Sequence, residues 1–178
     1  MMKTVLLLVA GAIAVSVGVV LVLAAMKPDT FHVERSTRIE ATPEKIYPLL
    51  ADYRAWRRWS PYEFDPAMKR NYSGAESGAG SIYEWDGKDM GSGRMEMLEA
   101  SPSKFLIKLD FFKPFEANNM AAFTLEPEQG EAATKVTWSL DGPLPFTAKV
   151  MHVFVNMDKM VGGQMNEGLA KLKAAAES

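Results

Sequence analysis

The sequence of 178 residues has 20 lysines and arginines against 22 aspartates and glutamates, a formal net charge of −2, and 48% of its residues are hydrophobic. This is the composition of one globular domain, and because it has no basic excess to attract nucleic-acid phosphates, we expect no nucleic-acid partner. The chain has no cysteine and only two histidines, which excludes disulfides, thiolate zinc sites, cysteine nucleophiles and histidine-rich metal cages. We therefore expect neither a metal site nor a cofactor.

The N-terminal segment is uncharged and strongly apolar. Residues 4–26 contain no charged side chain and lie between Lys3 and Lys27. As a helix, residues 5–26 would be about 33 Å long at about 1.5 Å per residue, close to the roughly 30 Å of bilayer hydrocarbon. The pattern predicts a membrane span.

The length of this segment favours an uncleaved anchor over a signal peptide, whose apolar region usually has only about 7–15 residues. We divide the chain into a transmembrane anchor at 1–27 and a soluble ligand-binding domain at 28–178. Cleavage of the segment as a signal peptide is the alternative, because Val22-Leu23-Ala24 could serve as the cleavage site. A bacterial-type inner membrane is the expected location. Basic residues near both ends of the span leave the side of the soluble domain unassigned.

A strand and a helix follow the apolar segment. Residues 31–39 contain stretches of apolar and polar alternation, which is typical of a strand. Thr42 can cap a helix, Pro43 suits its first turn, and Glu44 complements its dipole. Pro48 removes a backbone hydrogen bond inside this helix, so we expect a kink or an early end there.

The middle of the chain alternates like a succession of strands. Residues 104–112 show the pattern most clearly, with apolar side chains on one face and Lys104, Lys108 and Asp110 on the other. The strands expected here are 68–72, 81–85, 94–100, 104–112, 119–126 and 134–140. One dry and one wet face indicate a curved antiparallel sheet.

The C-terminal part changes to a helical period. Val150, Phe154, Met157 and Val161 recur at spacings of four and three, which predicts a long helix with an apolar stripe. Two glycines at 162–163 would cost about 2 kcal/mol relative to alanines, so we expect a bend at this point.

Three glycines raise the question of a dinucleotide-binding loop. Gly74, Gly78 and Gly80 precede an alternating aromatic segment that stops at Asp86 and Gly87. A phosphate-binding loop must instead open a helix whose N-terminal amides receive the phosphate. The glycines are therefore interpreted as a loop between antiparallel strands.

The order of these elements resembles the helix-grip layout of the START-like superfamily, also called SRPBCC. The motifs that match its polyketide cyclase/dehydrase-like subgroup are ERSTRIEATPEKIY, WRRWSPY, YSGAESGAGSIYEWDG, LDFFKPFEANN and MDKMVGGQMNEGLAKLK. The resemblance covers residues 31–173. It implies an α+β helix-grip fold, a curved antiparallel sheet of about six or seven strands wrapped around a long C-terminal helix, after one N-terminal transmembrane helix. It also implies a cavity between sheet and helix for a hydrophobic small molecule, such as a lipid, a quinone or a polyketide-like compound.

Large apolar side chains are predicted to line this cavity from both sides. With 12 methionines in the chain, the lining would adapt to irregular ligands. Such stripes also fill ordinary cores, and that alternative stays open at each position. The predicted ligand-binding residues are Tyr83, Trp85, Met95, Met97, Phe105, Ile107, Leu109, Phe111, Phe123, Trp138, Val150, Phe154 and Met157.

The sequence offers no recognisable catalytic motif. No serine lies in a G-x-S-x-G context, His32 has no evident partner, and His152 is expected on a solvated helix face. Asp110 is expected outside the cavity, whereas Tyr83 and Asn119 are the best candidates to orient a ligand or to act chemically. We favour a membrane-anchored module that binds a hydrophobic small molecule. The alternatives are an enzyme of cyclase, dehydratase or hydrolase type, and an anchored protein-interaction domain with a filled core.

Overall fold

The computed structural model describes residues 2–128 and 132–178, with the backbone alone for residues 3 and 7. It divides into two compact units. The anchor unit consists of the chain up to Phe31 together with Pro143–Met157. The sheet unit consists of His32–Gly142 and Asp158–Ser178.

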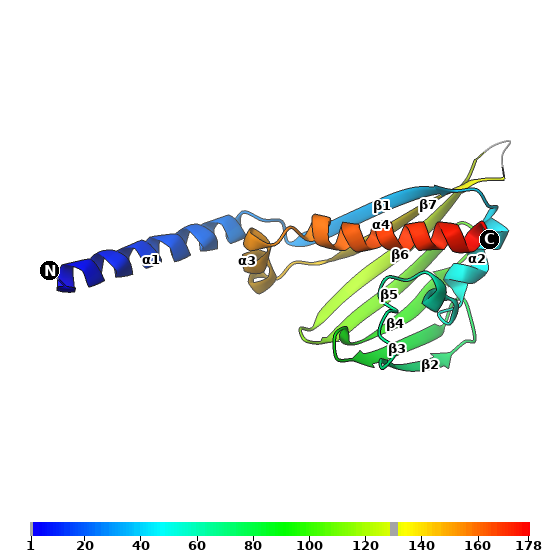
Figure 1. Ribbon diagram of the computed structural model, residues 1–178, viewed down its shortest axis with the longest axis horizontal. Helices are drawn as coiled ribbons and strands as arrows, with labels where there is room; N and C mark the ends of the chain where they lie inside the picture. Colours follow the sequence, from blue (N-terminus) through cyan, green and yellow to red (C-terminus); the bar gives the residue numbers. More distant parts are fainter. Residues whose placement is uncertain (1, 129–131) are drawn as a thin grey trace. The chain divides into compact units, whose positions relative to one another are not determined.

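A seven-stranded sheet forms the sheet unit's main layer (Figure 1). Its strands are β1 (Thr30–Ile39), β2 (Lys69–Gly74), β3 (Ser81–Gly87), β4 (Gly91–Ala100), β5 (Lys104–Lys113), β6 (Ala117–Pro127) and β7 (Thr134–Pro143). From β2 to β7 each strand pairs antiparallel with the next, and β1 lies beside β7. A register shift between Met97 and Glu99 marks a bulge against β5, a device that bends a sheet. The predicted α+β sheet is confirmed.

Two short helices connect β1 to β2. These are α2 (Pro43–Ala51) and a 3-10 helix, η1 (Ala55–Arg58). Pro43 occupies the first turn of α2, as expected, while Thr42 at the N-cap makes no capping hydrogen bond through its side chain. The helix passes Pro48 and ends at Ala51, three residues later.

The connection between β2 and β3 confirms the interpretation of the glycines. Gly74, Gly78 and Gly80 all have φ between 72° and 86°, a left-handed conformation that glycine adopts readily. A Cβ on Gly74 would collide with the carbonyl oxygen of Gly80. The loop joins two antiparallel strands and opens no helix, so it lacks the context of a dinucleotide site.

The predicted C-terminal helix is present as two helices. They are α3 (Phe146–Phe154) in the anchor unit and α4 (Met157–Ala176), nearly all of which belongs to the sheet unit. The interruption falls at Val155 and Asn156, whereas α4 continues through Gly162 and Gly163. A Cβ on Gly162 would collide with the guanidinium of Arg35, which holds Asp158 through two hydrogen bonds of 2.9 Å.

The anchor unit combines α1 (Met2–Ala25) with α3, which pack on each other. The segment Thr4–Ala25 contains an 18-residue window with a mean hydropathy of 2.9, so α1 is long and apolar enough to cross a membrane, a property that signal sequences share. Asp29, which follows α1, makes two contacts with the segment of α3. The backbone carbonyl of Asp29 accepts a hydrogen bond from the N–H of Leu144, and the carboxylate of Asp29 pairs with Lys149 at 2.6 Å.

Candidate functional site

Four cross-strand rows of side chains line one face of the sheet, which we call the inner face. Strand alternation places all the predicted ligand-binding residues of the sheet in these rows. The first row is Phe105, Phe123 and Trp138; the second is Met97, Ile107, Ala121 and Leu140; the third is Tyr83, Met95, Leu109 and Asn119; the fourth is Trp85, Gly93, Phe111 and Ala117.

Burial decreases from the first row to the fourth. Every member of the first row is buried, and the second is buried except for Leu140. Leu109 in the third row and both Phe111 and Ala117 in the fourth are half-buried. The inner face therefore has a closed end at the first row and an open end at the fourth, where apolar side chains keep part of their surface exposed.

The closed end is filled by aromatic rings. Trp59 packs edge-on against Phe123 and Trp138, with both centroids 5.8 Å away. Its indole N–H donates to the carbonyl of Leu49 at 2.9 Å. A Cβ on Gly168 of α4 would lie 2.9 Å from the ring of Trp138, so the helix approaches the sheet closely here. This end of the inner face is therefore closely packed, and the part that its residues play in ligand binding stays a prediction.

Three polar side chains form a buried network beside the third row. The hydroxyl of Tyr83 donates to Oε1 of Glu63 at 2.5 Å, and Nε of Arg70 donates to Oε2 of the same carboxylate at 2.7 Å. The Glu63 and Arg70 side chains are 5% and 10% exposed, respectively. Burial, followed by the hydrogen bond to Glu63, raises the pKa of Tyr83 far above its usual value. Tyr83 is therefore a protonated donor rather than a base.

The predicted polar candidates lie at opposite ends of the third row. Tyr83 is engaged by Glu63, while Oδ1 of the buried Asn119 has no hydrogen-bond partner among the described residues. The buried hydroxyl of Tyr53, whose ring centroid lies 5.8 Å from that of Tyr83, is likewise without a partner there. Asp110 lies on the opposite face of the sheet, as expected, where Lys108 approaches it at 3.0 Å.

The predicted helical residues are found in the anchor unit. Val150 and Met157 are half-buried, and Phe154 is 73% exposed. None of these three residues lies in the four rows of the sheet, so their role in ligand binding stays a prediction. His32 is exposed and pairs with Asp141 at 2.6 Å. His152 is only partly exposed, and burial lowers its pKa.

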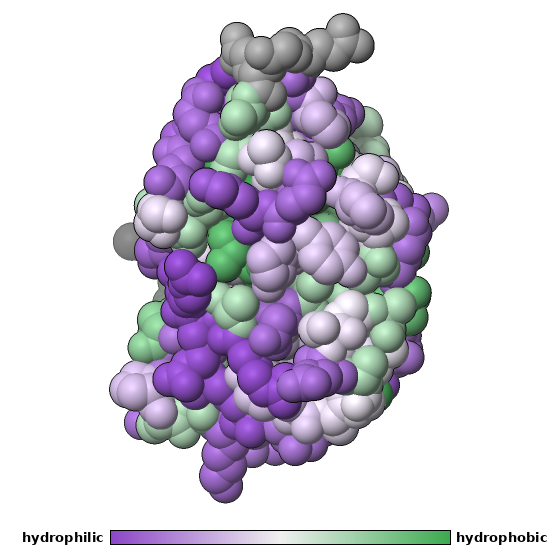
Figure 2. Space-filling model, turned by 90° about the vertical axis from the view of Figure 1, so that its right-hand side faces the viewer, coloured by the Kyte–Doolittle hydropathy of each residue, from purple (hydrophilic) through white to green (hydrophobic). Residues whose placement is uncertain are grey.

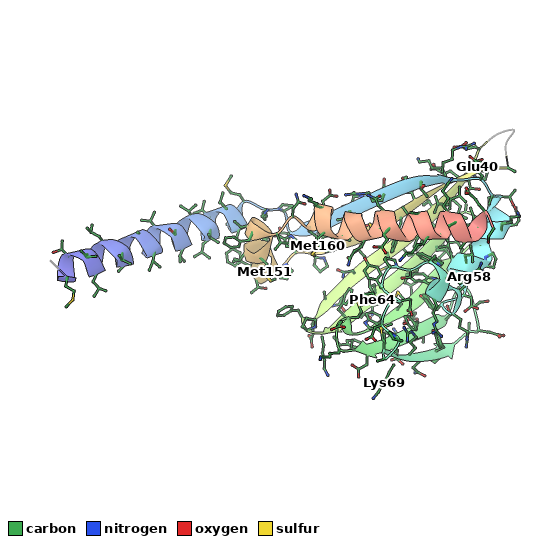
Figure 3. The ribbon with its side chains drawn as sticks, viewed as in Figure 1. Glu40, Arg58, Phe64, Lys69, Met151 and Met160 are labelled. Atoms are coloured by element: carbon green, nitrogen blue, oxygen red, sulfur yellow. The ribbon has the colours of Figure 1, made fainter. Side chains whose placement is uncertain are left out.

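A separate hollow of about 680 Å³ lies beside α2 and the C-terminal end of α4. Its lining mixes small residues with charged ones, including Lys45, Asp52, Arg58 and Glu76, and includes no member of the four rows. Figure 2 shows this end of the molecule as mostly hydrophilic with scattered apolar residues, and Figure 3 labels Arg58 there. Its mixed charge does not favour a hydrophobic ligand.

Glu63, Arg70, Tyr53 and Trp59 are parts of the site that the sequence did not predict. Trp59 had a signal, since its spacing of three from Trp56 places both on one helical face. Glu63 had none, because it lies in an irregular segment between η1 and β2.

A curved sheet closed by a C-terminal helix, with an apolar inner face open at one end, defines a ligand-binding fold of the polyketide cyclase type. The chain belongs to the family described as polyketide cyclase / dehydrase and lipid transport, whose model matches residues 30–177. No curated protein matches it.

Solved structures with the same fold have low sequence identity to this chain. An uncharacterized protein from Bacillus thuringiensis is 16% identical with a TM-score of 0.58, over 83% of this chain and 100% of that one. The di-domain ARO/CYC protein BexL from the BE-7585A biosynthetic pathway is 14% identical with a TM-score of 0.62, over 88% and 53%. Norcoclaurine synthase from Thalictrum flavum, a point mutant with a transition-state analogue, is 12% identical with a TM-score of 0.59, over 84% and 97%.

Proposed function

We propose that this protein is a membrane-anchored module that binds a hydrophobic small molecule, such as a lipid, a quinone or a polyketide-like compound, at the open end of the inner face. The observation that carries the proposal is the fall in burial from the first row to the fourth. An apolar core without a ligand is normally buried throughout, so half-buried Leu109 and Phe111 near the open end favour an apolar ligand there.

The N-terminal helix supports the membrane part of the proposal. Apart from Thr4 and Ser16, its exposed side chains in residues 4–25 are apolar, and no charged residue interrupts residues 4–26. A helix of this kind is stable where lipid surrounds it, since each leucine or valine exposed to water is unfavourable. We propose that residues 1–27 anchor the domain at 28–178 in a bacterial-type inner membrane.

The polar groups favour binding over catalysis. The only proton of the Tyr83 hydroxyl is donated to Glu63, so it is not free to polarise a substrate carbonyl. Oδ1 of Asn119 and the hydroxyl of Tyr53, which have no hydrogen-bond partner in the described part of the chain, are suited to orient a ligand that carries its own hydrogen-bonding group.

A matched pair of variants on β5 tests the proposal. Leu109 and Leu106 are both half-buried on the same strand, and they point to opposite faces of the sheet. Leu109→Glu places a carboxylate against the ligand, whereas Leu106→Glu places it on the outer face. After incubation of the full chain with a total lipid extract, retained small molecules are extracted and counted by mass spectrometry.

We expect Leu109→Glu to lower retention at least about tenfold, because an apolar contact with an unpaired carboxylate costs more than about 1.4 kcal/mol. Leu106→Glu should retain as much as the wild type. Equal retention by both variants would contradict ligand binding at the open end of the inner face.

An enzyme of cyclase, dehydratase or hydrolase type remains the second candidate, favoured by the buried Tyr83, Glu63 and Arg70 network and by the structural similarity to norcoclaurine synthase. This function requires turnover of the bound compound that disappears in Tyr83→Phe while the compound is still retained. Unchanged turnover in that variant would exclude Tyr83 from the chemistry.

A further inference from the structure

Helix α3 has its polarity reversed with respect to water. The one cationic side chain of the helix, Lys149, is only 8% exposed. Phe146, Met151 and Phe154, together with the following Val155, are 40–73% exposed. In a helix at the surface of a soluble domain the arrangement is the opposite, with the charge outside and the aromatic side chains inside. We call these four exposed residues the α3 patch.

The α3 patch belongs to the same compact unit as the membrane-spanning helix. The two helices pack on each other, and Ala24, next to the last residue of α1, is fully buried. Asp29, four residues beyond the end of α1, pairs with Lys149 at 2.6 Å. Figure 3 shows Met151 on α3 beside this end of α1. These contacts hold α3 where the membrane span ends.

We propose that α3 lies in the bilayer interface and inserts the α3 patch among the lipids at the boundary of headgroups and acyl chains. The inference rests on the proposed anchor, because α1 brings the patch to that depth. The exposed apolar surface then continues from α1 to α3 within one unit, and lipid covers both. The pairing of Lys149 with Asp29 leaves no unpaired cation on α3 for anionic lipid, so a neutral lipid surface is sufficient.

The absence of cysteine permits a direct test on the full chain. Phe154→Cys and Met151→Cys each provide a single site for the environment-sensitive fluorophore NBD at an exposed position of the patch. Lys69→Cys on β2, also exposed, is the matched control in the sheet unit. Each labelled chain is reconstituted into phosphatidylcholine vesicles with or without lipids that carry a spin label near the headgroup. Tryptophan fluorescence verifies that the sheet unit is folded, since all four tryptophans lie in it.

The inference predicts at least about twofold quenching at positions 151 and 154 and none at 69. Water-like, unquenched emission at 154 in chains that float with the vesicles would overturn it and leave the anchor intact. Blue-shifted but unquenched emission would also overturn it, because a second copy of the chain would then cover the patch. Failure to float would overturn the anchor and this inference together. Ligand retention by Leu109→Glu and Leu106→Glu does not depend on these fluorescence and flotation results, so a failure of this inference can be distinguished from a failure of the proposed ligand binding.

Discussion

Glu63 accepts hydrogen bonds from the side chains of Tyr83 and Arg70, and its removal leaves both without their charged partner. In Glu63→Ala, Arg70 keeps only its hydrogen bonds to the carbonyls of Met68 and Asp65, and the hydroxyl of Tyr83 loses its acceptor. We expect the free energy of unfolding to fall by about 3 kcal/mol, because an unpaired buried charge is costly. Guanidinium unfolding in mild detergent, followed by tryptophan fluorescence, measures it.

Glu84→Ala is the control for this prediction. Glu84 accepts a hydrogen bond of 2.8 Å from Asn71 at the exposed sheet edge, where such pairs contribute little. The control should lose no more than about 0.5 kcal/mol. If Glu63→Ala and Glu84→Ala lowered the free energy of unfolding equally, the network of Tyr83, Glu63 and Arg70 would contribute no more stability than an exposed hydrogen bond.

For single residues, the sequence predicts which face of the sheet a side chain occupies better than it predicts how deeply that side chain is buried. Alternation assigns Leu109 and Phe105 to the same face because side chains alternate along a strand. It does not predict that Phe105 is fully buried and Leu109 only half-buried, since that difference depends on what covers each position. Glu63 lies in a segment without periodicity, so no pattern indicates where its side chain points.

Helix α4 offers a matched pair of glycines at the scale of the element. A Cβ on Gly168 would lie 2.8 Å from Pro61 Cδ and 2.9 Å from Trp138, whereas a Cβ on Gly163 meets nothing within 4 Å. We expect Gly168→Ala to lower the free energy of unfolding by about 1–3 kcal/mol through overpacking. Gly163→Ala should raise it by about 0.5–1 kcal/mol through helix propensity. Stabilisation by both substitutions would contradict the close contact of α4 with the closed end.

Helix α3 is expected to loosen in mild acid. Burial, followed by the charge of Lys27, lowers the pKa of His152 below its ordinary value of 6.5. The folded anchor unit therefore favours the neutral imidazole, and the unfolded state binds the proton more readily. The resulting stability is complete above pH 6.5 and is lost as the pH falls through the lowered pKa.

Amide hydrogen exchange of α3 at pH 7.5 and 5.5, corrected for intrinsic rates, measures this effect. Protection should decrease at the lower pH in the wild type and stay constant in His152→Gln, which cannot gain the proton. The same decrease in both chains would assign the pH dependence to another group.

Element boundaries are predictable where the local pattern decides them. The strands of the sheet agree with alternation to within a few residues, because the same burial that selects apolar side chains defines each strand. The interruption at Val155 and Asn156 was not predictable, since the apolar stripe continues across it and the glycines that suggested a bend lie one turn or more further on. Gly162 is present for the close approach of Arg35 rather than for a bend.

At the scale of the whole molecule, the ligand-binding fold is interrupted by a segment that belongs to the other compact unit. Residues Pro143–Met157 belong with the N-terminal segment, although they lie between β7 and most of α4 in the chain. Sequence periodicity is local and gives no sign of this pairing between segments far apart. The family resemblance predicts the sheet and closing helix but describes them as one domain.

Native mass spectrometry of the full chain, extracted in mild detergent from the organism that encodes it, shows whether the protein carries a hydrophobic ligand. We expect a discrete adduct of a lipid, quinone or polyketide-like mass that survives removal of the detergent, because the open end of the inner face keeps an apolar ligand out of water. The bare chain mass, both as isolated and after incubation with a total lipid extract, would contradict it. The inner face would then be a core whose fourth row is merely less covered.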